Sequence, residues 1–135
     1  MRPRRIERGR GDPGAARRCY YESLELSSEL GLGDLIIENF EGLGLVAHAQ
    51  GDGVVAMRLL GAAAANRARL QLRPKPTREM QIEKVVSREQ ASARATADSE
   101  WRLGSALDTR SAVRYALEMA GALPSPQAEA VLLGR

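Results

Sequence analysis

Apolar residues recur along this chain at three- and four-residue spacing, in stretches separated by short breaks that contain glycine or proline. Such spacing places the apolar side chains on one face of an α-helix. Alanine, leucine, arginine and glutamate dominate the composition, whereas long runs of β-branched residues are missing. We therefore predict an all-α fold of about five to six helices, each too long to be read as a buried strand.

The breaks divide the chain into an arm, a core, a linker, a cap and a tail. We predict a disordered basic arm over 1–13, a helical-repeat core over 14–71, a linker over 72–77 that contains Pro74 and Pro76, a C-terminal helical cap over 78–121 and a flexible tail over 122–135. Within these parts the periodicity predicts helices over 15–30, 34–50, 54–69, 78–102 and 109–120, with a short helical turn near 129–133.

A weak internal repeat occurs at an offset of 40 residues. Gly11-Asp12 recurs as Gly51-Asp52, each time just before a predicted helix, and Ala16 then aligns with Ala56. A helix pair cannot bury its apolar stripe alone, so successive pairs stack and share a core. We predict tetratricopeptide-like antiparallel hairpins that form a short α-solenoid, in which helix 15–30 is the second helix of a pair.

Several segments in order carry a family resemblance: Ala16-Arg-Arg-Cys-Tyr-Tyr-Glu-Ser-Leu-Glu-Leu, the Glu41 to Asp52 turn, Ala56-Met-Arg-Leu-Leu-Gly-Ala-Ala-Ala, Trp101-Arg-Leu-Gly-Ser-Ala-Leu and Ser111-Ala-Val-Arg-Tyr-Ala-Leu-Glu. Over residues 11–121 the chain resembles the C-terminal tetratricopeptide-like region of bacterial LuxR-type and adenylate-cyclase-linked ATPase transcriptional regulators, of the signal-transduction ATPase class. The resemblance implies a non-catalytic interaction or scaffold module, and a chain that is a C-terminal fragment or relic of such a regulator. Its partner would be a protein or an adjacent regulator domain, and self-association is a further expectation.

The sequence offers no constellation typical of an enzyme, so we predict no catalytic residue, no cofactor and no metal. There is no phosphate-binding loop of the Walker type. The single histidine, His48, is expected to pack or to form a hydrogen bond, and the single cysteine, Cys19, lies on the apolar stripe as a small core residue. Glu38 and Glu41 share a helix face, and we expect both to be solvated.

Large apolar and aromatic residues on the predicted stripes are expected to form the packing contacts. These residues are Tyr20, Leu24, Phe40, Leu43, Leu59, Leu60, Trp101 and Tyr115. Trp101 has two interpretations: it is a residue type that anchors partners at interfaces, whereas the resemblance implies that it holds the C-terminal helices together. Small residues inside a helix permit a close neighbour, so Gly42 and Gly44 predict a helix that is approached closely.

The basic charge of the chain is concentrated at its start. Residues 1–18 hold seven arginines against Glu7 and Asp12, whereas the remainder is slightly acidic. An arm of this kind is typical of a solvated terminus, but it also suits contacts with phosphates. The alternative function is therefore a small nucleic-acid-binding protein that uses Arg2, Arg4 and Arg5. No apolar run approaches the length of about 20 residues that a membrane span needs, and the expected location is the cytoplasm.

Overall fold

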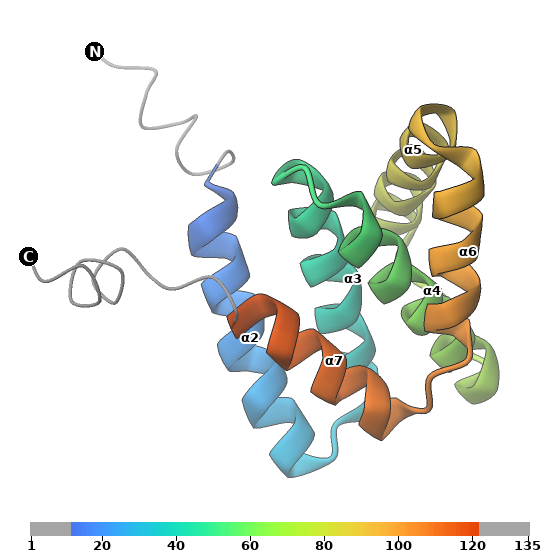
Figure 1. Ribbon diagram of the computed structural model, residues 1–135. Coiled ribbons are helices and arrows are strands. Elements are labelled where there is room, and N and C mark those ends of the chain that lie inside the picture. Colours follow the sequence, from blue (N-terminus) through green and yellow to red (C-terminus); the bar gives the residue numbers. More distant parts are fainter. Residues whose placement is uncertain (1–11, 122–135) are drawn as a thin grey trace, which may run out of the picture.

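The computed structural model describes residues 12–121, and within that range the chain forms six α-helices and no strand, which confirms the all-α prediction. The helices are α2 (Pro13–Leu30), α3 (Gly33–Ala49), α4 (Gly53–Leu70), α5 (Pro76–Ser92), α6 (Arg94–Ser105) and α7 (Thr109–Gly121) (Figure 1). The predictions for the arm before residue 12, for the tail over 122–135 and for Arg2, Arg4 and Arg5 lie outside the described residues.

Helices α2 and α4 have matching bounds and matching ends, forty residues apart. The carboxylate of Asp12 accepts a hydrogen bond from the backbone N–H three residues ahead at 3.1 Å, and that of Asp52 does the same at 3.2 Å. Such a cap contributes about 1 kcal/mol to helix stability. Each helix is followed by a residue in the left-handed conformation, Gly31 or Gln71. The weak sequence repeat therefore has a structural counterpart, and Asp12 belongs to a helix start and not to a disordered arm.

Helix α3 lies between α2 and α4 (Figure 1). On the α2 side, the amide of Asn39 donates hydrogen bonds to the hydroxyls of Ser23 at 3.0 Å and Ser27 at 3.3 Å. One turn further along the same face, a Cβ atom at Gly42 would overlap the ring of Tyr20. The glycine therefore allows the tyrosine to lie directly on the helix backbone.

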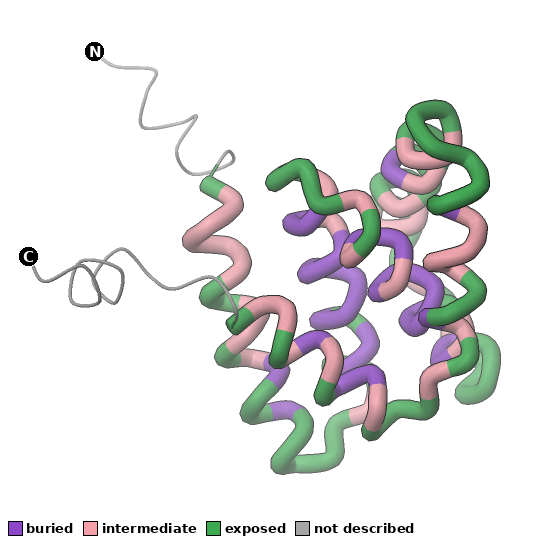
Figure 2. The backbone as a smooth tube through the Cα atoms, viewed as in Figure 1, coloured by how far each residue is buried: buried purple, intermediate pink, exposed green. Residues whose placement is uncertain are grey.

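The residues of α3 that contact α4 come two positions after those that contact α2. Glu41 pairs with Arg67 of α4, and a Cβ atom at Gly44 would lie 2.9 Å from two side-chain carbons of Leu60. Residues two apart on a helix point in nearly opposite directions, because each residue advances the turn by about 100°. Residues 39–44 are all buried as a result, and this stretch forms the centre of the molecule (Figure 2).

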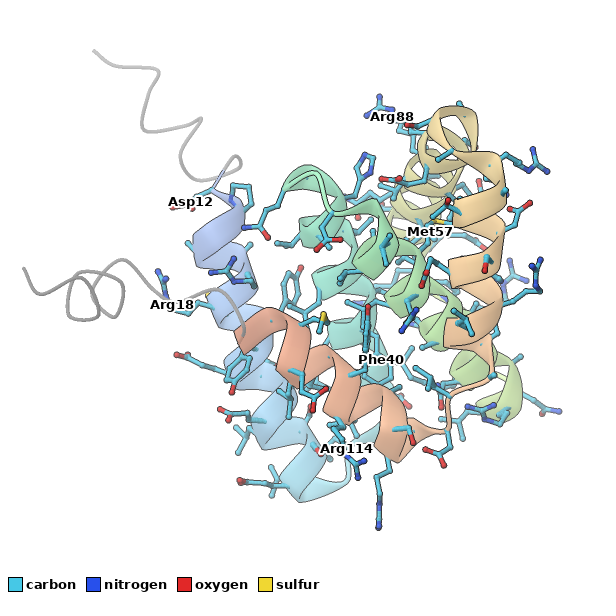
Figure 3. All side chains as sticks on the ribbon, in the orientation of Figure 1. Asp12, Arg18, Phe40, Met57, Arg88 and Arg114 are labelled. Atoms are coloured by element: carbon cyan, nitrogen blue, oxygen red, sulfur yellow. The ribbon has the colours of Figure 1, made fainter. Side chains whose placement is uncertain are left out.

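Helix α7 crosses α2, α3 and α4 and closes the core (Figure 1). Its small residues Ala112, Val113 and Ala116 join a buried cluster whose larger members come from the other three helices. Phe40, labelled in Figure 3, is fully buried in this cluster. The segment that the sequence assigns to a cap thus shares one core with the repeat segment.

The prediction of one long helix over 78–102 is wrong, because the chain turns back at Ala93. This residue has φ −155° and ψ 78°, so it separates α5 from α6. The two helices lie side by side, and Gln90 of α5 donates a hydrogen bond to Asp98 of α6 at 3.1 Å. The reversal places α6 against α4.

The predicted linker over 72–77 is also too long, since α5 begins at Pro76. Proline suits the first position of a helix, because its missing N–H would have no partner there and its φ is already helical. The connection between α4 and α5 is therefore confined to residues 71–75.

Helix α6 approaches α4 almost backbone to backbone. A Cβ atom at Gly61 would lie 3.1 Å from the carbonyl carbon of Trp101, and one at Gly104 would lie 2.8 Å from that of Arg58. At the edge of this contact Arg58 forms an ion pair with Glu100 at 2.6 Å. Glycine on each helix therefore sets the distance between them.

Helix α5 is held less firmly than its neighbours. Val85 is the one residue of this helix that is buried. A polar contact adds to it, since His48 of α3 lies 2.6 Å from the carboxylate of Glu89 through its Nδ1 atom. In the part of the chain that the structure describes, no helix is both long enough and apolar enough to span a lipid bilayer.

Candidate binding cavities

A cavity that we call the apolar cavity lies between α4, α5, α6 and the 71–75 connection, and its volume of about 320 Å³ exceeds that of the other two cavities described below. This volume is at the lower end of the range for small-molecule and side-chain pockets. Its lining is mostly apolar, with charged side chains among it. The apolar lining residues are Leu60, Ala64, Ala68, Leu72, Pro74, Ile82 and Trp101, and the charged ones are Glu41, Arg67, Arg73, Glu79 and Glu83.

A second, smaller hollow, which we call the basic cavity, shares Glu41 and Arg67 with the apolar cavity. It has a volume of about 120 Å³ and is completed by Glu38, Lys75 and Arg78. The side chains around it are all ionisable, so its character is opposite to that of the first cavity. The buried pair of Glu41 and Arg67 therefore forms a wall common to both.

This pair is bidentate. The Nε atom of Arg67 donates to one carboxylate oxygen of Glu41 at 2.6 Å, and Nη2 donates to the other at 3.0 Å. Glu41 is 1% exposed and Arg67 is 9% exposed, so the expectation that Glu41 is solvated is wrong, although Glu38 is exposed. The hydrogen bond to Glu41 raises the pKa of Arg67 further above its ordinary value, against the opposing effect of burial. Two parallel charge-assisted bonds offset much of the cost of removing both charges from water.

Arg67 keeps donors that the protein does not use. A guanidinium group has five N–H donors, and among residues 12–121 only two of those on Arg67 have an acceptor, both on Glu41. Buried donors without acceptors are rare in folded proteins and call for an explanation. No sequence pattern points to this site, because an arginine near the end of an amphipathic helix is ordinarily a solvated residue.

The eight residues predicted to form packing contacts differ in how far they are buried. Five of them are buried, namely Leu24, Phe40, Leu43, Leu59 and Leu60. The other three, Tyr20, Trp101 and Tyr115, are partly exposed. Trp101 contacts α4 through its backbone, and the residue also lines the apolar cavity.

Tyr115 lies beneath the guanidinium of Arg58, whose carbon is 5.1 Å from the ring centre. Burial raises the pKa of Tyr115, and the nearby cation opposes that rise. Three other arginines, Arg18, Arg88 and Arg114, point away from the body at separate places (Figure 3).

The prediction that Cys19 is a core residue is wrong, since this cysteine is exposed. It precedes Tyr20, which contacts α3 at Gly42, and the two neighbours lie about 100° apart around α2. His48 takes part in the hydrogen bond to Glu89 described above. Within the described range, no three or more histidine, cysteine, aspartate and glutamate side chains lie close enough together to hold a metal ion.

A third cavity, of about 120 Å³, lies between α2, α3, α4 and α7. It is lined largely by core residues such as Leu43, Val46 and Leu59, and no buried polar side chain of the described residues reaches it. Its polar lining side chains, Arg17, Gln50 and Asp52, are partly or largely exposed, so the buried charges that line the three cavities are those of Glu41 and Arg67. Comparison of the chain with protein-family models, with curated proteins and with solved structures finds no match.

Proposed function

We propose that this chain is a non-catalytic helical-repeat binding module that holds a segment of a partner protein, or of an adjacent regulator domain, in the apolar cavity. The observation that carries the proposal is the cavity itself, where an apolar lining meets a buried arginine with unused donors. Ligand sites in proteins combine these features, because apolar surface supplies affinity and a few fixed polar groups supply orientation.

Trp101 gives the cavity an anchor of the type found at binding hot spots. Tryptophan is enriched among the residues that contribute most to protein association. Here it lies beside Ile82 and Leu60, with Glu79 and Glu83 also in the lining. An apolar core with charged groups around it is the usual anatomy of an interface. A volume of about 320 Å³ suits one or two large side chains and not a whole folded surface.

The tetratricopeptide-like character of the module, and its origin in an ATPase-class transcriptional regulator, are parts of the same proposal. Two features support them: the order of the resembling segments in the sequence, and the matching ends of α2 and α4 on either side of α3. Repeat modules present grooves between stacked helices to their partners. The apolar cavity lies in such a position, between α4 and the helices that follow it.

The proposal can be tested with Trp101 as the reporter, because the sequence contains a single tryptophan. Small aromatic and aliphatic compounds are titrated into the full chain, and the emission of Trp101 is followed. In the variant Ala64→Phe a ring is expected to fill the cavity from an exposed lining position, whereas the control Ala95→Phe places a ring on an exposed position of α6 outside the lining.

We expect saturable binding to the wild type and to the Ala95→Phe control, and its loss in Ala64→Phe. A protein retained by the wild type and released by Ala64→Phe is the natural partner under this proposal. The proposal fails if no compound binds, or if both variants bind as well as the wild type.

A further inference from the structure

Two of the three unused donors of Arg67 lie together on one edge of its guanidinium. Glu41 takes the edge formed by Nε and Nη2. The edge formed by Nη1 and Nη2 has no acceptor within residues 12–121, although Arg67 is only 9% exposed. Two parallel N–H groups on a guanidinium match the two oxygens of a carboxylate or phosphate. Arg67 therefore retains the donors for a second bidentate pair.

Two further cations of the basic cavity come from the start of α5. Lys75 precedes the helix and forms no ion pair with any described residue. Within residues 12–121, Arg78 donates only to neutral acceptors at 3.4 Å, namely the carbonyl oxygen of Glu38 and the hydroxyl of Tyr20. Neither cation is therefore neutralised by a close carboxylate.

The first turn of α5 adds backbone donors at the same place. No side chain of residues 12–121 caps this helix, and the basic cavity is lined by Lys75, which precedes it, and by Arg78 of its first turn. The N-terminal N–H groups of a helix carry a partial positive charge and attract anions. This feature and the buried arginine are independent of each other, and both favour an anionic group.

The charges around the basic cavity indicate which anion fits. Three cations, Arg67, Lys75 and Arg78, face two carboxylates, Glu38 and Glu41, so the lining has an excess of one positive charge. A carboxylate neutralises this excess. A phosphate close to its double charge would leave a net negative site beside Glu38. The volume of about 120 Å³ also suits a single small group.

We propose that the basic cavity is a subsite for a carboxylate, held by the Nη1 and Nη2 edge of Arg67 and supported by Lys75, Arg78 and the start of α5. The inference rests on the proposed function, because the carboxylate would belong to the segment that occupies the apolar cavity. The two cavities share a wall, so that segment carries a large apolar side chain beside an acidic side chain or a C-terminal carboxylate.

The test uses the full chain labelled with nitrogen-15 and propionate as the probe, at constant ionic strength. Propionamide has the same shape without the charge, and inorganic phosphate supplies the competing anion. We expect propionate to shift the Nε–H signal of Arg67 and the backbone signals of 77–79 in a saturable manner, while propionamide leaves them unchanged.

One lysine variant and one arginine variant test the subsite without altering the buried Arg67. Lys75→Met should raise the dissociation constant for propionate about two- to fivefold, as expected for the loss of one partly exposed ion pair. Arg88→Gln removes an exposed cation from the same helix, away from the cavity, and should leave the constant unchanged (Figure 3).

Equal shifts with propionamide, equal effects of the two variants, or tighter binding of phosphate than of propionate would each overturn the carboxylate subsite. Loss of propionate binding while apolar compounds still bind at Trp101 refutes this inference alone. Intact propionate binding with no apolar compound bound refutes the proposed function and leaves the subsite standing.

Discussion

The close crossing of α4 and α6 makes the substitution Gly104→Ala a stringent test of the fold. A Cβ atom at this position would lie 2.8 Å from the carbonyl carbon and 3.0 Å from the Cα atom of Arg58. Ordinary carbon–carbon contacts are about 3.5–4.0 Å. The neighbouring atoms belong to the backbone and cannot rotate away, so α6 must move outward by roughly 1 Å.

The cost follows from two opposing effects. Overpacking of a filled contact costs about 1–3 kcal/mol, and we take the upper end because backbone meets backbone. Alanine is better than glycine inside a helix by about 1 kcal/mol. The expected net destabilisation is therefore about 2 kcal/mol, which lowers Tm by roughly 8 °C for a folded unit of this size.

Denaturation by urea and by heat measures this effect, and the same substitution at Gly14 is the matched control. At Gly14 the nearest atom to an added Cβ is 3.6 Å away, which is an ordinary contact. Gly14→Ala should leave stability unchanged or raise it slightly. If Gly104→Ala proved as stable as Gly14→Ala, α6 would not lie on α4 at the distance described.

Further outcomes follow from the buried pair, the exposed leucines and the arm. Arg67→Met should lower the free energy of unfolding, measured with urea, by about 3–5 kcal/mol, because it leaves the Glu41 carboxylate buried without a partner. Adding Glu41→Leu should restore most of that loss. If the losses caused by the two substitutions simply added, the pair would not be coupled as described. Leu26 and Leu30 are 57% and 60% exposed, so we expect concentration-dependent sedimentation that weakens in Leu30→Lys. If the N-terminal arginines bind DNA, the affinity of the full chain should fall steeply with salt concentration. DNA binding that persists after deletion of residues 1–11 would refute this alternative function.

Helix existence and most helix ends could be read from the sequence, because they depend on local chemistry. The predicted helix over 15–30 and the observed α2 differ by two residues at one end, since Asp12 caps and Gly31 terminates the helix as their residue types favour. The prediction that α3 is approached closely at Gly42 and Gly44 is also confirmed, since Tyr20 contacts the helix at Gly42 and Leu60 contacts it at Gly44.

The errors concern features that depend on distant parts of the chain. No glycine or proline marks the reversal at Ala93, although it allows α6 to pack on α4, with Gly104 against the backbone of Arg58. Cys19 falls near the apolar stripe of its helix, and only the position of α3 shows that it points outward.

The candidate site could not be predicted from the sequence, because it too depends on residues that are far apart in the chain. Glu41 and Arg67 are 26 residues apart and lie on different helices, so no spacing rule joins them. Only the packing of α4 on α3 brings the carboxylate and the guanidinium together and leaves the far edge of Arg67 open. Burial of charge is a tertiary property, and amphipathic patterns assign charged residues to the surface.

The contrast between the fully enclosed α3 and the lightly held α5 predicts two regimes of hydrogen exchange. Amides of 39–44 should exchange only when the whole molecule unfolds, whereas those of α5, with Val85 as its one buried residue, should exchange through local opening. Because α5 forms part of the wall of both cavities, a bound ligand should slow the local opening of α5, and it should also slow exchange at 39–44, since it raises the free energy of global unfolding. Slower hydrogen exchange of the α5 amides would therefore report that a cavity is occupied. Mass spectrometry of α5 peptides could detect binding of a ligand before that ligand is identified.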